Sequence, residues 1–166
     1  MRNNLLLFAA LALALPAVHA GDLDSVESVT REVYNTISGP AGPRDWAKFR
    51  ALFADGARLI SIRTANGVST PNVMTPDEYA TRAGANFEKN PFYESESARR
   101  VETFGAIAHV FSTYESRRAP GEKPFARGIN SFQLVKTPQG WKVMTILWDS
   151  EREGNPLPEK YLTGPK

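Results

Sequence analysis

The sequence predicts an α+β domain, in which helices from the first half of the chain pack on antiparallel strands from the second half. Three segments before residue 91 place apolar residues at helical spacing, whereas the pattern after it changes to the period of strands, with both faces apolar in the last strand at 141–151. Short turns separate these later segments, as expected for strands that follow one another in a sheet. Early helices and late antiparallel strands are typical of the α+β class.

The individual elements follow from these patterns and from their end signals. Thr75, Pro76 and Glu78 have the spacing of a capping box with proline in the first turn. Asp22 or Asp24 is the expected N-cap of the first helix. Helices are expected at 22–38, 42–56 and 75–90, strands at 57–64, 106–118, 125–136 and 141–151, a turn at 65–72, and a polar extended stretch at 92–104.

The first 20 residues have the layout of a secretory signal. Arg2 precedes an unbroken apolar run from Leu5 to Leu15, and small residues at Val18 and Ala20 predict cleavage after Ala20. The run is shorter than the roughly 20 residues of a membrane-spanning helix, although an uncleaved anchor is the alternative. We therefore expect an exported, periplasmic or extracellular protein, with one domain at 21–152 and an irregular tail at 153–166.

Composition excludes several function classes. The chain has no cysteine, which removes disulfides, thiolate nucleophiles and cysteine-ligated metals. His19 leaves with the signal, so His109 is the only histidine of the mature chain and a histidine-based metal site is not expected. Loss of Arg2 lowers the formal charge from +2 to +1, which gives no electrostatic case for nucleic acid. No nucleotide-binding motif occurs, and we expect no cofactor.

Three segments carry a resemblance to a known family: FADGARLIS, GAIAHVFSTYE and GINSFQLVKTPQGWKVMTILWDS. Their order and spacing resemble the nuclear transport factor 2-like superfamily, in particular its SnoaL-like (polyketide cyclase-like) and ketosteroid isomerase-like branch. The resemblance implies a cone, in which three helices pack on the concave face of a curved, mostly antiparallel sheet. It also implies a pocket at the open end of the cone and, often, a dimer through the convex face.

One position departs from the ketosteroid isomerase-like pattern. Members of that branch carry their catalytic base on the first strand, where this chain has Ser61 and no acid nearby. Asp55 remains, but it is better explained as a turn residue between helix and strand. Isomerase chemistry of that kind is therefore in doubt.

The two turns between the last three strands predict which residues share a face. With Gly121 at the centre of the first turn, opposite residue numbers add up to about 242, and with Pro138 and Gln139 in the second they add up to about 277. A slip of one residue would exchange the faces. The resemblance places the following set inside the cone: Ala108, Val110, Ser112, Tyr114, Gly128, Asn130, Phe132, Leu134, Val143, Thr145, Leu147 and Asp149.

Polar residues gather at one end of this inner set and predict a pocket. Asp149 is the candidate acid–base group, because burial near Leu147 and Trp148 would raise its pKa. Tyr114 is its candidate partner, and Tyr114, Tyr34 or Asn130 would stabilise an enolate-type oxygen. Alternatively, Asp149 ends the strand and pairs with an Arg or Lys. The residues expected to contact a ligand are Tyr34, Trp46, Ser112, Gly128, Asn130 and Leu147.

The opposite face of the same strands is also apolar and predicts a homodimer surface. His109 lies there in the predicted register, and a hydrogen-bonded interface or core histidine is the simpler explanation of it. The predicted dimer residues are Ile107, His109, Phe111, Met144, Ile146 and Trp148.

Three functions are compatible with these patterns. The first is an exported domain that binds a small apolar or aromatic molecule, favoured by the absence of a first-strand base and of standard motifs. The second is a cofactor-free lyase, isomerase or cyclase that uses Asp149 and a tyrosine. The third is a dimerising interaction module without a ligand. The sequence names neither the ligand nor the biological process.

Overall fold

The computed structural model describes residues 20–164. The predicted signal segment lies outside these residues, apart from its last position. The elements are η1 (Ala20–Leu23), α1 (Val26–Ile37), α2 (Trp46–Ala51), β1 (Phe53–Ala65), β2 (Val68–Met74), α3 (Pro76–Phe87), β3 (Tyr93–Phe104), β4 (Ile107–Arg117), β5 (Ala126–Thr137), β6 (Gly140–Ser150) and η2 (Glu159–Tyr161).

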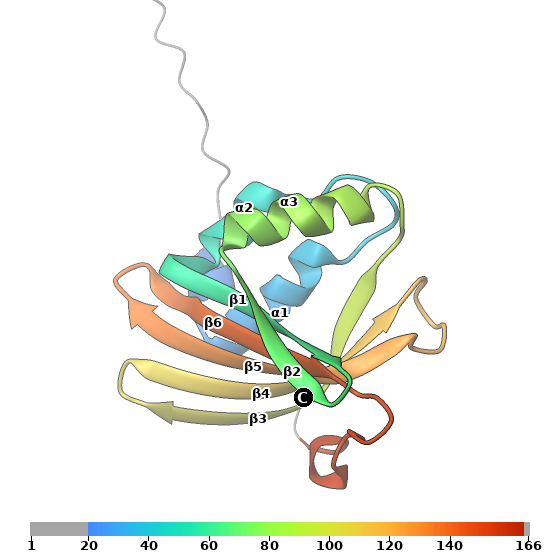
Figure 1. Ribbon diagram of the computed structural model, residues 1–166. Coiled ribbons are helices and arrows are strands. Elements are labelled where there is room, and N and C mark those ends of the chain that lie inside the picture. Colours follow the sequence, from blue (N-terminus) through green and yellow to red (C-terminus); the bar gives the residue numbers. More distant parts are fainter. Residues whose placement is uncertain (1–19, 165–166) are drawn as a thin grey trace, which may run out of the picture.

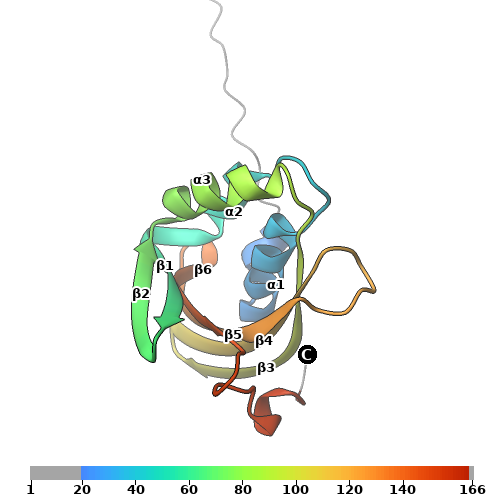
Figure 2. The ribbon, with the colours of Figure 1, turned by 45° about the vertical axis from the view of Figure 1, so that its right-hand side comes forward.

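The six strands form one sheet in the order β2-β1-β6-β5-β4-β3, in which β1 and β6 are parallel and all other neighbours are antiparallel. The sheet curves around α1, while α2 and α3 close the same side from above (Figures 1 and 2). The C-terminal segment with η2 lies on the other side of the sheet (Figure 2). The α+β cone is therefore confirmed, and its concave face is the one that the helices cover.

The first helix begins one turn later than predicted, because a serine pair caps it. The Ser25 hydroxyl accepts from the Ser28 backbone N–H at 3.0 Å, and the Ser28 hydroxyl accepts from the Ser25 N–H at 3.0 Å. This reciprocal arrangement satisfies two backbone donors at the helix start. Val29 and Val33 then face the core and are buried.

The third helix has the predicted capping box and the predicted first-turn proline. Thr75 accepts from the Glu78 N–H at 3.2 Å, and Glu78 accepts from the Thr75 N–H at 2.7 Å. The helix contains Gly84, although glycine weakens helix interiors. A Cβ at this position would come 3.2 Å from Nε1 of Trp46, so the glycine leaves room for that ring to pack on the helix.

Two other regions differ from the prediction. The second helix ends at Ala51, and β1 begins at Phe53, where a register shift up to Arg58 disrupts the strand pattern. The stretch predicted as a turn, 65–72, contains the first five of the seven residues of β2, which pairs with β1 through a tight Asn66-Gly67 turn. Both turn residues have positive φ (51° and 76°), as a hairpin turn of this size requires.

The register of β4 with β5 is as predicted, since Ala108 pairs with Leu134 and Tyr114 pairs with Gly128. The β5–β6 register follows the prediction only near the turn, where Leu134 pairs with Val143. Beyond that pair the register shifts, and Gln133 pairs with Thr145.

The residue left unpaired by this shift is Met144, which forms a β-bulge. Because a one-residue shift exchanges the faces of a strand, every later residue of β6 faces the side opposite to the predicted one. Ile146 is inside and buried, whereas Leu147 is outside and 38% exposed. The inward placement of Thr145, Leu147 and Asp149 and the outward placement of Ile146 and Trp148 are therefore wrong.

In the part of the chain that the structure describes, no helix is both long and apolar enough to cross a membrane.

Candidate functional site

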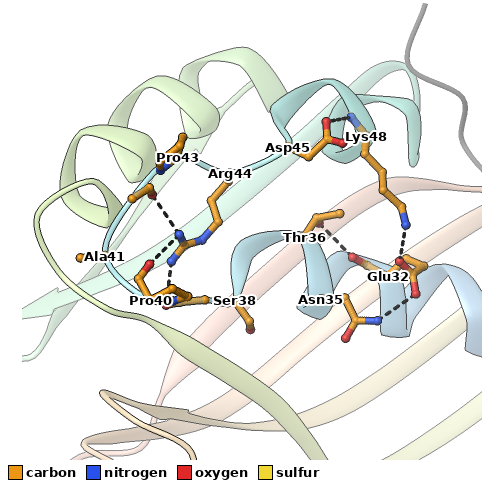
Figure 3. A pocket seen from close by; sticks show the side chains of 12 residues that line it. Glu32, Asn35, Thr36, Ser38, Pro40, Ala41, Pro43, Arg44, Asp45 and Lys48 are labelled. Atoms are coloured by element: carbon orange, nitrogen blue, oxygen red, sulfur yellow. Dashed lines mark hydrogen bonds and ion pairs between the residues drawn. The ribbon is translucent and has the colours of Figure 1, made fainter.

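One surface hollow, of about 410 Å³, lies between the end of α1 and the loop that leads to α2. Arg44 fills its centre, and the guanidinium donates to backbone carbonyls of the same loop (Figure 3). The acceptors are Ile37 at 3.0 Å, Pro40 at 2.8 Å, Gly42 at 2.9 Å and Gly39 at 2.9 Å. The arginine therefore holds the loop together and is not available as an anion-binding group.

The candidate site is a second hollow, a cavity of about 230 Å³ between the helices and the concave face of the sheet. All three helices contribute to its wall, with Tyr34 from α1, Phe49 from α2 and Tyr79 from α3. Of its sixteen lining residues, eight are aromatic, and the other members are Val33, Ile37, Leu59, Glu94, Ser116, Ala126, Asn130 and Ile146. An apolar cavity with a few converging polar groups is the usual form of a small-molecule site.

Glu94 on β3 is the one acid among the residues that line this cavity. Its Oε2 accepts from the Ser116 hydroxyl at 2.7 Å, and its Oε1 makes a longer contact of 3.5 Å with Nδ2 of Asn130. The surrounding protein raises the pKa of Glu94 from 4.5 to about 7, because burial disfavours the charged form more than these two hydrogen bonds favour it. The carboxyl group can therefore hold or release a proton near neutral pH.

A chain of hydrogen bonds leads from the cavity to Glu96 on β3. Asn130 Nδ2 donates to the Tyr34 hydroxyl at 3.1 Å, this hydroxyl lies 2.7 Å from Oγ of Ser112, and Ser112 donates to Glu96. Glu96 also pairs with Arg99 at 2.7 Å. Since Ser112 donates to Glu96, it accepts from Tyr34. The Tyr34 proton is therefore directed away from the cavity, and burial raises the pKa of this phenol.

Tyr114 also lines the cavity, and its position depends on Gly128. The Tyr114 hydroxyl lies 2.9 Å from Oγ of Ser150, and burial raises its pKa. A Cβ on Gly128 would come 2.6 Å from the Tyr114 hydroxyl oxygen and 2.3 Å from the carbonyl oxygen of Asp149. The glycine thus gives space to a tyrosine ring, where the sequence predicted a contact with a ligand.

The structure brings together part of the predicted site. Tyr34, Tyr114 and Asn130 line the cavity, and Ser112 is buried behind Tyr34. Trp46 lies behind the cavity wall, where its ring packs edge-on against Phe49 at 5.4 Å between centroids.

Two other predicted site residues lie on the outer face. Leu147 and Asp149 line a separate groove between the sheet and the C-terminal segment. Asp149 Oδ1 pairs there with Arg152 at 2.6 Å, which is the alternative that the sequence left open. The inward position of Asp149 is wrong because of the Met144 bulge, whereas its catalytic role stays a prediction.

Some of the predicted dimer residues lie on the outer face, and others face the cavity. Ile107 is 60% exposed on the outer face, and His109 lies beside it with Nε2 3.1 Å from Oγ of Ser131. Phe111 is covered by Tyr161 of the C-terminal segment, with ring centroids 4.9 Å apart. Met144 is exposed at the bulge, and Ile146 and Trp148 face the cavity.

The first strand has no acid in the cavity, as the sequence indicated. Ser61 pairs with Trp148 of β6 and accepts from Nδ2 of Asn72 at 3.2 Å. The residues that sequence reasoning missed are Glu94, Ser116 and Tyr79. Among the described residues no group of three or more His, Cys, Asp or Glu side chains is placed to hold a metal ion.

No model of a known protein family matches this chain, and no curated protein matches it. Solved structures do share its fold. A candidate calcium/calmodulin-dependent protein kinase type II association domain from Thiobacillus denitrificans superimposes with a TM-score of 0.60 at 11% identity, over 78% of this chain and 98% of that one. A candidate dehydratase of the NTF2-like family from Streptomyces avermitilis gives 0.58 at 14% identity, over 80% and 97%.

A third structure, an NTF2-like protein of unknown function from Pseudomonas putida, gives a TM-score of 0.57 at 12% identity. It covers 84% of this chain and 94% of its own. At such low identities these likenesses show the fold and leave the activity open.

Proposed function

We propose that this chain, which has the nuclear transport factor 2-like (NTF2-like) fold, is an exported domain that binds a small and largely apolar organic molecule in its concave cavity. The cavity itself carries the proposal. Half of its lining residues are aromatic, and Glu94, Ser116 and Asn130 bring polar groups to one side of it. Its volume of about 230 Å³ lies below the usual range for drug-sized ligands, roughly 300–1,000 Å³, and therefore favours a compact ligand such as a single substituted ring.

The test is mass spectrometry of small molecules that co-purify with the mature protein. The variant Ala126→Leu adds atoms to the cavity wall and should carry less of any bound compound. Ala47→Leu changes an exposed position on α2 and is the matched control. Equal amounts of the same compound on all three proteins would show that it is bound elsewhere.

A second candidate is a cofactor-free enzyme that moves a proton, such as a lyase, isomerase or cyclase. The observation in its favour is that the pKa of Glu94 is raised to about 7, which suits a general acid or base at neutral pH. Tyr79 and Tyr114 line the same cavity, and their hydroxyls could stabilise a developing oxyanion, whereas the Tyr34 proton is committed to Ser112. In this hypothesis Glu94 takes the role that the sequence suggested for Asp149.

We keep the SnoaL-like branch as a proposal on the basis of the three sequence segments that resemble it. Export also stays a proposal, supported by the basic, apolar and small-residue order of residues 1–20. Mass spectrometry of the protein from a secreting host should find an N-terminus at Gly21, and a retained Met1 would argue against cleavage.

We also propose a homodimer through the outer face, centred on the exposed Ile107 and on His109. Met144 extends this apolar surface at the bulge, and Leu147 replaces the inward-facing Ile146 and Trp148 as a contact. Phe111 contributes less to such a contact because Tyr161 covers it.

A further inference from the structure

The cavity has an ionisable group that an apolar ligand does not explain. Glu94 receives hydrogen bonds on both carboxyl oxygens, from Ser116 and from Asn130. Donors on both oxygens stabilise a carboxylate more than a neutral carboxylic acid. None of the residues that line the cavity is a Lys, Arg or His, and none of the ion pairs among the described residues includes Glu94.

Two arginines near Glu94 but outside the cavity pair with other carboxylates. Arg99 of the same strand pairs with Glu96 at 2.7 Å. Arg117 of β4 pairs with Glu115 and also donates to the Glu122 carbonyl at 2.8 Å.

Two further elements pack around the same carboxyl group. Arg31 of α1 lines a separate polar hollow together with Glu94 and is not among the residues that line the apolar cavity. The phenols of Tyr34, Tyr79 and Tyr114 approach from α1, α3 and β4, and burial raises the pKa of each, so all three are neutral at physiological pH. The cavity side of Glu94 therefore faces neutral groups.

The remaining wall of the cavity suits a cation as well as an apolar ring. Tyr79 and Trp148 pack edge to face, with centroids 6.3 Å apart, and Phe92 and Phe125 pack in a similar way at 6.3 Å. Phe125 already carries a cation, the Arg118 guanidinium 4.2 Å from its ring centroid, so Tyr79, Phe92 and Trp148 are the rings considered for a ligand. Faces of aromatic rings attract ammonium groups, and a carboxylate beside such rings supplies the opposite charge. An uncharged ligand would use the rings and leave the carboxylate without a counter-charge.

We propose that the cavity binds a small organic cation, an amine attached to an apolar ring or chain, with its ammonium group against Glu94. This inference rests on the proposed function, because it names the ligand class of the same cavity. The ammonium group donates to the Glu94 carboxylate, and the apolar part lies among the aromatic side chains. A bound cation favours the ionised carboxylate, so binding strengthens as the pH rises through about 7.

The experiment compares two probes of nearly equal shape, benzylamine and benzyl alcohol, by calorimetry on the mature protein at pH 8 and pH 5.5. The amine of benzylamine is protonated at both values, as the similar ammonium of lysine is. At pH 8 we expect benzylamine to bind about tenfold or more tightly than benzyl alcohol, because a hydrogen-bonded charge pair replaces a neutral contact. At pH 5.5 the preference should shrink severalfold, since Glu94 is then mostly protonated.

The variant Glu94→Gln should remove the preference at both pH values while benzyl alcohol still binds, which shows that the cavity is intact. Glu102→Gln changes an exposed glutamate of the same strand and should keep the preference. If benzyl alcohol binds as tightly as benzylamine to the wild-type protein at pH 8, the amine inference is wrong and the proposed binding function stands. If neither probe binds, both are wrong.

Discussion

The raised pKa of Glu94 predicts how the stability of the protein depends on pH, and this can be measured without a ligand. This pKa rises from 4.5 to about 7 in the folded protein, a difference of about 2.5 pH units. Each unit corresponds to about 1.4 kcal/mol, so the ionised carboxylate costs the folded state about 3 kcal/mol. Below pH 4.5 both states carry the proton and this cost is absent. Between pH 4.5 and 7 only the unfolded state releases the proton, so the folded state loses stability as the pH rises, and above about pH 7 the loss is complete.

Replacement of the carboxyl by an uncharged amide of the same shape should therefore stabilise the protein in a pH-dependent way. We expect Glu94→Gln to raise the free energy of unfolding at pH 8 by about 3 kcal/mol relative to its effect at pH 4.5. The measurement is urea unfolding of both proteins, followed by tryptophan fluorescence at the two pH values. Other titrating groups contribute equally to both proteins and cancel in the difference.

Glu102→Gln is the control, since this side chain is exposed on the same strand and its replacement should have little effect at either pH. A Glu94→Gln effect that is the same at pH 4.5 and pH 8 would refute the raised pKa. A variant that is less stable than the wild type only at pH 8 would mean that the site stabilises the carboxylate, which is the opposite of the argument.

Further substitutions test the packing of the sheet and the proposed dimer. Gly128→Ala should lower the free energy of unfolding by about 1–3 kcal/mol in urea titrations, because its Cβ would stand 2.3 Å from the Asp149 carbonyl oxygen; an unchanged value would mean that this crowding relaxes at no cost. Ile146→Asn should lower the melting temperature by far more than Leu147→Asn, since the first side chain is 4% exposed and the second 38%. The reverse order would contradict the β-bulge at Met144. Ile107→Lys should reduce the dimer fraction in sedimentation, whereas a wild-type protein that is monomeric at micromolar concentration would contradict the outer-face dimer.

The fold could be predicted from the sequence because its signals are local. The capping box of Thr75 and Glu78 and the apolar spacing of Val29 and Val33 depend only on near neighbours in the chain. The β4–β5 register also followed from a single turn. The strand β2 was missed because its middle, residues 69–72, is polar apart from Pro71, which a strand at the edge of a sheet tolerates.

The site could not be predicted in the same way, because two β-bulges decide which acids face the cavity. Without the bulge at Met144, Asp149 would face inward with Tyr114, as the sequence indicated. The second irregularity is in β3, where Arg99 pairs with Ser112 and Ala98 with Thr113, but Glu96 pairs with Tyr114. Ser97 is the residue left over at this shift.

If the register that follows the second bulge, from Ala98 onward, were continued back toward Tyr93, Ser97 would pair with Tyr114 and face inward, and Glu94 and Glu96 would face solvent on the outer side. The bulge exchanges these positions, and both glutamates turn toward the interior, where Ser116 and Ser112 donate to them. Neither bulge has a glycine or proline to mark it. The polar strand β3, whose alternation favours a solvated edge strand, thus supplies Glu94 as the acid of the cavity. Asp149, near the end of the apolar strand β6, pairs instead with Arg152 on the surface.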